Sequence, residues 1–192
     1  FRGPAAYVFH PMNAYQVGDQ LICDVCEYGE APLFPHADGS KPDPSKANAV
    51  LRRWTLDLAG NTDDYKVDQL HDHVCEFPRL DERFAGLSYR HGYFGCEGAA
   101  PSKSGGFSAI GHVDHERGQV ETFDMGPNFA ASEPVFVPRG SAEGEGYLLT
   151  NVYDASIDRS HLVILDAENV SAGPLAKAYL DHRVPFGFHG NW

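Results

Sequence analysis

Two histidines near opposite ends of the chain have neighbours that suit a metal ligand. His10 lies in the string FHPMNAYQ, and His189 lies in the final string FGFHGNW. Neutral imidazole is the commonest side-chain ligand for transition metals. Both histidines have aromatic and small neighbours, where a solvent-exposed histidine is not expected. We therefore predict that His10 and His189 form half of a metal site, and that the chain end is tucked into the protein rather than frayed.

A metal-bound histidine usually donates its second ring N–H to a carboxylate or a carbonyl. Two acidic residues lie in apolar strings that could provide this partner: Glu76 in CEFPR and Glu133 in SEPVFVPR. A carboxylate is costly to bury unless it has a partner. Composition alone leaves a second interpretation open, in which each glutamate is a solvated strand end.

A second pair of histidines, His71 and His73 in the string HDH, precedes Glu76. Residues i and i+2 lie on one face of a strand, so a metal-dependent hydrolase site at HDH and Glu76 stays an alternative. Cys23 and Cys26 form a C-x-x-C pattern inside LICDVCEY, which is typical of a strand. Residues i and i+3 point to opposite faces of a strand, so we expect apolar, reduced thiols rather than a zinc or redox site.

The composition limits the classes of partner. The chain has 192 residues and a formal net charge of −12, which argues against nucleic acid and anionic membranes as partners. No apolar run approaches the roughly 18 residues of a membrane span, and no signal peptide is present, so we expect a cytoplasmic protein. Because the chain begins without Met, we also expect it to be part of a longer protein.

The elements that must position these residues are short strands. The chain has 20 Gly and 13 Pro, which favours turns over long helices. His112, His115 and His161 flank predicted turns and are expected to be exposed. Residues 31–46 and 98–106 are predicted loops. The predicted strands are AYVFH, QLICDVCEY, AVLRRWTLDL, YKVDQL, FSAIGHVDH, QVETFDM, EPVFVP, GYLLTNVYD and HLVILDA.

A weak internal repeat suggests how the strands are arranged. Asp57, Asp114 and Asp166 each end a predicted strand just before a turn, at spacings of 57 and 52 residues. A period near 50 residues with about four strands per unit is typical of β-propeller blades, although a sandwich also has short strands and frequent turns. The sequence therefore predicts an all-β fold over residues 1–192, with fewer than four blades.

Six ordered sequence blocks, of which the first begins at Phe9 and the last ends at Trp192, span nearly the whole chain. They are FHPMNAYQ, CEFPRLDERFAG, SEPVFVPR followed by EGEGYLLTNVYD, SHLVILDA, GPLAKAYL and RVPFGFHGNW. In this order the blocks resemble the C-terminal half of the carotenoid cleavage oxygenases. Their residues are most similar to those of the bacterial members, including the lignostilbene dioxygenases. One departure is Gln16, where the family commonly has Glu; we interpret it as a local change in hydrogen bonding.

The resemblance implies a seven-bladed β-propeller, of which this chain forms the C-terminal three to four blades, within a longer single-domain enzyme. It also implies a non-haem Fe(II) bound by four histidines. Three glutamates would contact the imidazole rings of these histidines without binding the metal. On the matching motifs, His10 and His189 are two of the metal ligands, and Glu76 and Glu133 are two of the three glutamates. The remaining ligands belong to the missing N-terminal half. We expect Glu76 to pair with His10 and Glu133 with His189, but the sequence leaves this open.

The activity that the resemblance implies is cleavage of an alkene C=C bond by O2, giving two carbonyl products. The expected substrate is a small hydrophobic alkene, either a stilbene-type phenol or an apocarotenoid. Phe84, Phe94, Phe129 and Phe188 could line its tunnel, although core packing is favoured for each. The segment alone is expected to be inactive. The alternative function is a non-catalytic β-propeller interaction module.

Overall fold

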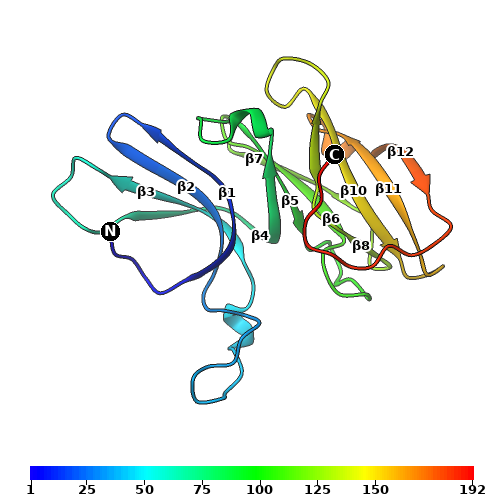
Figure 1. The fold of residues 1–192 in the computed structure, drawn as a ribbon, viewed down its shortest axis with the longest axis horizontal. Helices are drawn as coiled ribbons and strands as arrows, with labels where there is room; N and C mark the ends of the chain where they lie inside the picture. Colours follow the sequence, from blue (N-terminus) through cyan, green and yellow to red (C-terminus); the bar gives the residue numbers. More distant parts are fainter. The chain divides into compact units, whose positions relative to one another are not determined.

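The computed structural model describes residues 1–192 and shows an all-β chain that divides into two units. The first unit contains residues 1–76 and 85–88, and the second contains residues 77–84 and 89–192. Figure 1 shows the strands of both units, coloured along the chain. None of the helices has the length and the apolar character needed to cross a membrane.

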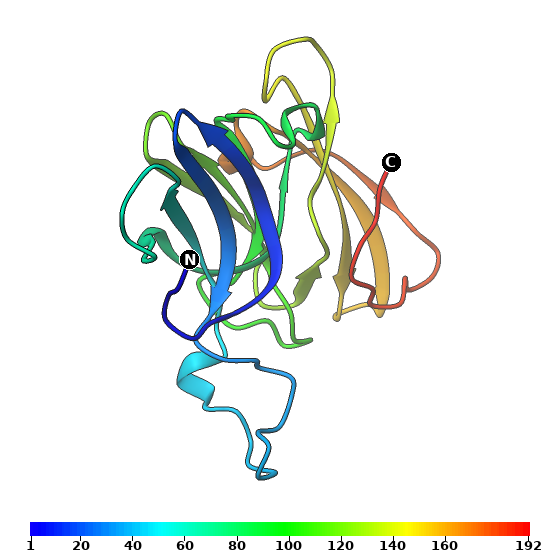
Figure 2. The ribbon, with the colours of Figure 1, turned by 60° about the vertical axis from the view of Figure 1, so that its left-hand side comes forward.

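The first unit is an antiparallel sheet in which each strand pairs with the next. Gly18 adopts a φ of 57° in the two-residue turn between the first two strands, a conformation that glycine adopts without strain. The loop of residues 31–46 extends away from this sheet in both views and ends in the short helix η1 (Pro44–Lys46) (Figures 1 and 2). The strands are β1 (Tyr7–Val17), β2 (Gln20–Tyr28), β3 (Val50–Asp57) and β4 (Lys66–Leu80), whose residues from position 77 onward belong to the second unit.

The second unit holds two antiparallel groups of strands. In the first group β5, β6 and β7 pair in order, and in the second the order is β12-β11-β10-β8, with β9 also paired to β10. The short helices are η2 (Glu82–Phe84) and η3 (Val170–Ala172). The strands are β5 (His91–Cys96), β6 (Ala109–Asp114), β7 (Gln119–Asp124), β8 (Phe129–Ala131), β9 (Val135–Pro138), β10 (Gly146–Asp154), β11 (Arg159–Asp166) and β12 (Pro174–Tyr179).

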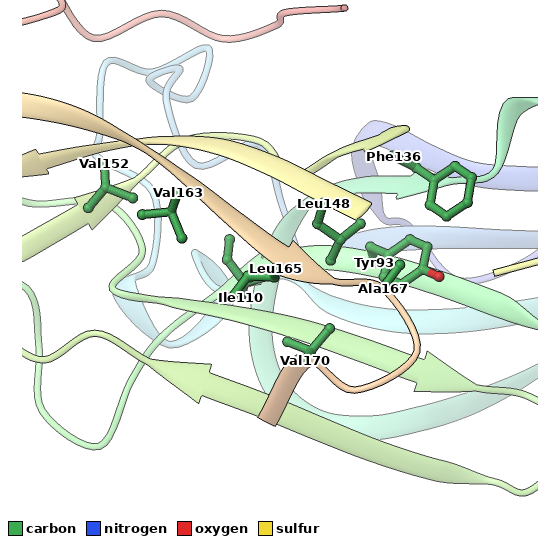
Figure 3. Close-up of a cluster of buried hydrophobic side chains, with 9 residues drawn as sticks. All are labelled: Tyr93, Ile110, Phe136, Leu148, Val152, Val163, Leu165, Ala167 and Val170. Carbon is green, nitrogen blue, oxygen red and sulfur yellow. The ribbon is translucent and has the colours of Figure 1, made fainter. Parts of the chain in front are cut away.

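The core of the second unit lies between these two groups of strands. Its largest members, Tyr93 on β5 and Phe136 on β9, stack with ring centroids 5.7 Å apart. Burying a large apolar side chain stabilises a fold by about 1.5–3 kcal/mol, so this cluster fixes the frame on which the C-terminal residues lie. Figure 3 shows its members: Tyr93, Ile110, Phe136, Leu148, Val152, Val163, Leu165, Ala167 and Val170.

The three aspartates of the internal repeat occupy equivalent positions in the structure. Asp57, Asp114 and Asp166 are the last residues of β3, β6 and β11. Each accepts a hydrogen bond from the backbone N–H two residues later, at 3.1, 3.1 and 2.9 Å respectively. This contact lets a short polar side chain close the turn that follows each strand. The repeat therefore reflects a recurring strand–turn–strand unit.

The nine predicted strands are all present, and the two predicted loops hold no strand. Sequence reasoning missed β5, β8 and β12, and it ended β1 and β4 too early. The prediction that His112 and His161 are exposed is wrong, because their exposed fractions are 5% and 3%. Both residues lie on buried strand positions, next to turns but facing the core.

Candidate metal-binding residues

His10 and Glu76 form a hydrogen-bonded pair in the first unit. His10 lies on β1 and Glu76 on β4, and their Nδ1 and Oε2 atoms are 2.6 Å apart. The glutamate side chain is only 6% exposed, whereas that of His10 is 24% exposed. Because the contact uses Nδ1, a metal would be bound through Nε2.

Tyr28, at the end of β2, is the second side chain at the Glu76 carboxylate. Burial raises the pKa of Tyr28 above its ordinary value, and the charge of Glu76 and a hydrogen bond with it raise this pKa further. The phenol therefore stays protonated and can donate to the carboxylate. Tyr28 was not singled out from the sequence, where a strand-end tyrosine has no distinguishing signal.

His189 and Glu133 form the corresponding pair in the second unit. The His189 Nδ1 and Glu133 Oε1 atoms are 3.1 Å apart, and the backbone N–H of Gly190 donates to Glu133 Oε2 at 3.0 Å. The Glu133 side chain is 4% exposed and lies in the connection between β8 and β9. Both pairings expected from the sequence are thus present, each through Nδ1 of its histidine.

The C-terminal segment after β12 has no strand or helix and is visible as the red end of the ribbon in Figure 2. The prediction that it is tucked into the protein is wrong for its side chains. Phe186, Phe188 and Trp192 are 58%, 70% and 70% exposed, and the His189 side chain is 54% exposed. Hydrogen bonds to Glu133 hold the segment near its end. Its aromatic rings bury only a small part of their surface in this chain.

Arg79, near the end of β4, contacts the same region of the second unit. Its Nη1 atom lies 3.2 Å from Glu133 Oε1 and donates to the carbonyl of Gly190 at 3.3 Å. Its Nη2 atom pairs with Glu82. Two residues earlier, Phe77 adopts a φ of 53°, which is rare for a bulky residue, and its ring meets the His189 ring edge-on at 6.2 Å.

A third histidine–glutamate pair differs from the other two. His112 Nδ1 lies 3.1 Å from Glu121 Oε1, but His112 Nε2 is 2.9 Å from Nδ1 of His91, and the ring stacks on Tyr93. Burial lowers the pKa of both His91 and His112 below the ordinary histidine value. Because both of its ring nitrogens are engaged, His112 serves packing between strands rather than metal binding.

The alternative sites are not assembled. His73 N–H donates to His71 Nδ1 at 3.2 Å, while Glu76 contacts His10 instead. Cys23 and Cys26 both lie on β2 and all four cysteines carry free thiols. The sulfur of Cys26 lies 4.0 Å from that of Cys75. The structure therefore brings together neither HDH with Glu76 nor the two thiols of C-x-x-C.

A pocket of about 690 Å³ lies in the second unit beside the C-terminal segment. Phe77, Phe107 and Phe188 are among its lining residues, with Glu133 and His189 at its polar part. Of the aromatic residues considered for a substrate tunnel, only Phe188 lines this pocket, while Phe94 is fully buried in the core. An apolar pocket with a few polar groups is the usual form of a small-molecule site.

The donor chemistry of His10 and His189 fits a transition metal such as Fe(II). Imidazole suits iron, and a carboxylate on the second ring nitrogen orients the ring and strengthens it as a ligand. The two buried glutamates have this arrangement with their histidines. No group of three or more His, Cys, Asp or Glu side chains is arranged to hold a metal.

Comparison with known proteins identifies close relatives over the whole chain. A family model described as "Retinal pigment epithelial membrane protein" matches residues 1–192. Lignostilbene-alpha,beta-dioxygenase isozyme III of Sphingomonas paucimobilis is 39% identical over 206 residues, and isoeugenol monooxygenase of Pseudomonas putida is 38% identical over 202 residues. Both alignments cover 100% of this chain and 42% of the relative. The chain thus spans about two fifths of these relatives' length.

A solved structure shows the same fold. The crystal structure of Pseudomonas brassicacearum lignostilbene dioxygenase matches with a TM-score of 0.90 and 30% sequence identity, covering 97% of this chain and 42% of that protein. The predicted fold class, all-β and part of a β-propeller, is confirmed by this match together with the strands described above. The resemblance noted in the sequence is likewise confirmed by the relatives.

Proposed function

The chain belongs to the carotenoid cleavage oxygenase family, and from that premise we propose that it is part of an enzyme that splits an alkene C=C bond with O2 at a non-haem Fe(II) centre. The products would be two carbonyl compounds. The observation that supports this proposal most is the presence of two buried carboxylates, each hydrogen-bonded to Nδ1 of a histidine in a family motif. His10 and His189 would bind the iron through Nε2.

In this proposal the bound Fe(II) supplies the binding and activation of O2. The residues of this chain orient the ligands. Glu76 accepts the Nδ1 proton of His10, which fixes the tautomer and presents the Nε2 lone pair to the metal. Glu133 does the same for His189 and also fixes the backbone at Gly190. Because imidazole is neutral, both ligands leave the positive charge of the metal site intact.

The substrate we propose is a small hydrophobic alkene, with a stilbene-type phenol favoured over an apocarotenoid. This preference rests on the names of relatives that act on lignostilbene and on isoeugenol. The apolar lining of the pocket beside His189 suits such a molecule. A cytoplasmic location is part of the proposal, since free thiols are typical of reducing compartments.

The proposal is tested with the full-length protein that contains this sequence. Wild type and the variants His10→Ala and His189→Ala are loaded with Fe(II) without oxygen, then given O2 and either a hydroxystilbene or an apocarotenal. We expect two carbonyl products from the wild type and a loss of at least 100-fold in each variant. His182→Ala is the matched control, because His182 is an exposed histidine of the same segment, paired with Asp181.

Two results would contradict the proposal. Cleavage that survives in both variants would exclude these histidines as ligands. A full-length protein that binds no iron and cleaves neither substrate would favour the non-catalytic interaction module. For residues 1–192 alone we expect weak iron binding, since two ligands are too few; tight stoichiometric binding of Fe(II) by this segment would contradict that expectation.

A further inference from the structure

We propose that Arg79 is a positioning residue that sets the place of His189 by holding Glu133 and the backbone of Gly190 together. This inference rests on the proposed function, because it concerns the same histidine. Arg79, Glu133 and Gly190 are named here the tail clasp. All three belong to the second unit, so their contacts are internal to it.

The clasp engages both backbone groups of Gly190. Its N–H donates to Glu133 Oε2 at 3.0 Å, and its carbonyl accepts from Arg79 Nη1 at 3.3 Å. The same Nη1 lies 3.2 Å from Glu133 Oε1, the oxygen that also contacts His189 Nδ1. The residue following the histidine is thus fixed at two points and the histidine ring at a third. These contacts hold the end of a segment whose start is held by the hydrogen bond from the Val184 N–H to Ser160 Oγ, at 3.0 Å.

Charge favours an arginine at this place. The Glu133 side chain is 4% exposed, and burying a carboxylate is costly unless it is hydrogen-bonded or paired with a cation. Arg79, itself only 16% exposed, supplies that charge. Its planar guanidinium offers several donors in fixed directions, so it can contact a carboxylate and a carbonyl at once, which a lysine ammonium does less well. Glu82 binds the other end of the guanidinium and limits its rotation.

The chain offers a matched control in Arg83, four residues later. Arg83 also pairs with a buried carboxylate, Asp81, and also donates to backbone carbonyls, those of Gly140 and Ala142. It touches neither Glu133 nor the C-terminal segment. The variant Arg83→Met therefore removes a comparable set of contacts without touching the clasp.

The test uses the full-length protein with Arg79→Met, Arg79→Lys and Arg83→Met. Hydrogen exchange of peptides covering residues 184–192 is measured by mass spectrometry without metal. Fe(II) affinity and the visible spectrum of the Co(II)-loaded protein follow. For Arg79→Met we expect roughly 10-fold faster exchange of this segment, about 10-fold weaker Fe(II) binding and an altered Co(II) spectrum. Arg79→Lys should restore part of each effect, and Arg83→Met should leave all three as in the wild type.

The results separate this inference from the proposed function. Unchanged exchange and an unchanged Co(II) spectrum in both Arg79 variants would overturn the role of Arg79, whatever the wild type binds. Equal changes in Arg83→Met would also overturn it, because the effect would then be general loss of stability. If the wild type binds no metal, the proposed function fails, while exchange in the metal-free protein still decides whether Arg79 orders the segment. If Arg79→Met does not fold, the comparison of Arg79→Lys with wild type decides the question.

Discussion

The His10–Glu76 and His189–Glu133 pairs both use Nδ1 of the histidine but are held in different ways. His10 and Glu76 both lie on strands, their contact is 2.6 Å long, and the second group at the carboxylate is the neutral phenol of Tyr28. His189 lies on a segment without strand or helix, its contact is 3.1 Å long, and its glutamate is shared with a backbone N–H and an arginine.

This difference suggests a division of roles between the two carboxylates. The contact of Glu76 with its histidine is 2.6 Å long and that of Glu133 is 3.1 Å long, so we expect Glu76 to accept the stronger hydrogen bond from its imidazole. Glu133 contacts three donors, so it positions a chain end without strand or helix as well as a histidine ring. We therefore expect changes at Glu76 to act mainly on the ligand itself, and changes at Glu133 to act on ligand and chain position together.

The largest expected effect is that of Glu76→Gln in the full-length protein. A neutral amide is a weaker acceptor and can donate instead, which would place the His10 proton on Nε2, where it blocks metal binding. We expect Fe(II) affinity to fall by about 100-fold, at the upper end of the range for such partners. An anaerobic titration measures this, and a loss below about 3-fold would contradict the role of Glu76.

A smaller loss of affinity, about 10-fold, is expected for Glu133→Gln, because its contact with the imidazole is longer and already shared. In addition, hydrogen exchange should rise for residues 184–192 in the metal-free protein, and it should not rise there in Glu76→Gln. If the two variants had the same affinity and the same exchange, the proposed division of roles would be wrong.

Glu121→Gln tests the comparison at the His112–Glu121 pair, which we expect to stabilise the fold without binding metal. Glu121 accepts from His112, from the backbone N–H of Val170 and from the hydroxyl of Ser171. Weakening these contacts should lower the free energy of unfolding by about 1–2 kcal/mol, measured by denaturant titration. Fe(II) affinity should stay within 2-fold of wild type; a larger loss would place His112 in the metal site.

The smallest expected effect is on the pH dependence of stability. The pKa values of His91 and His112 are lowered in the folded protein, chiefly by burial, so below about pH 6.5 the unfolded chain binds more protons than the folded one. Protonation of these histidines therefore favours the unfolded chain, and the free energy of unfolding falls as the pH drops below that value. His91→Asn should flatten the decline between pH 7 and 5 in metal-free protein; an unchanged slope would show that the pair does not cause it.

The sequence predicted well what depends on local pattern. Alternating and aromatic runs identified nine strands, and the run of Pro and Asp identified the loop of residues 31–46. Short or solvent-facing elements escaped notice: β8 has three residues, and β12 is almost entirely exposed, so neither has a clear hydrophobic period. The continuation of β1 past Pro11 was missed because its register shifts there, which no periodicity in the sequence indicates.

The candidate site was predictable to the extent that buried acids need partners. Glu76 and Glu133 stood in apolar strings, and the family motifs identified their histidines. Arg79 and Tyr28 could not be found in this way, because their roles depend on contacts with residues at least 48 positions away in the sequence. His112 was misjudged for the converse reason: its neighbours in sequence form a turn, while its neighbours in space are a core tyrosine and a second histidine.

The central claim is that His10 and His189 bind one iron through Nε2 while Nδ1 of each is held by its glutamate. It is tested most directly by a crystal structure of the iron-loaded full-length protein, with anomalous scattering recorded at the iron edge. We predict one anomalous peak with both Nε2 atoms at about 2.1 Å, the usual metal–imidazole distance, and both Nδ1–glutamate contacts intact. An iron peak bound by neither histidine, or bound through Nδ1 of either one, would contradict the account.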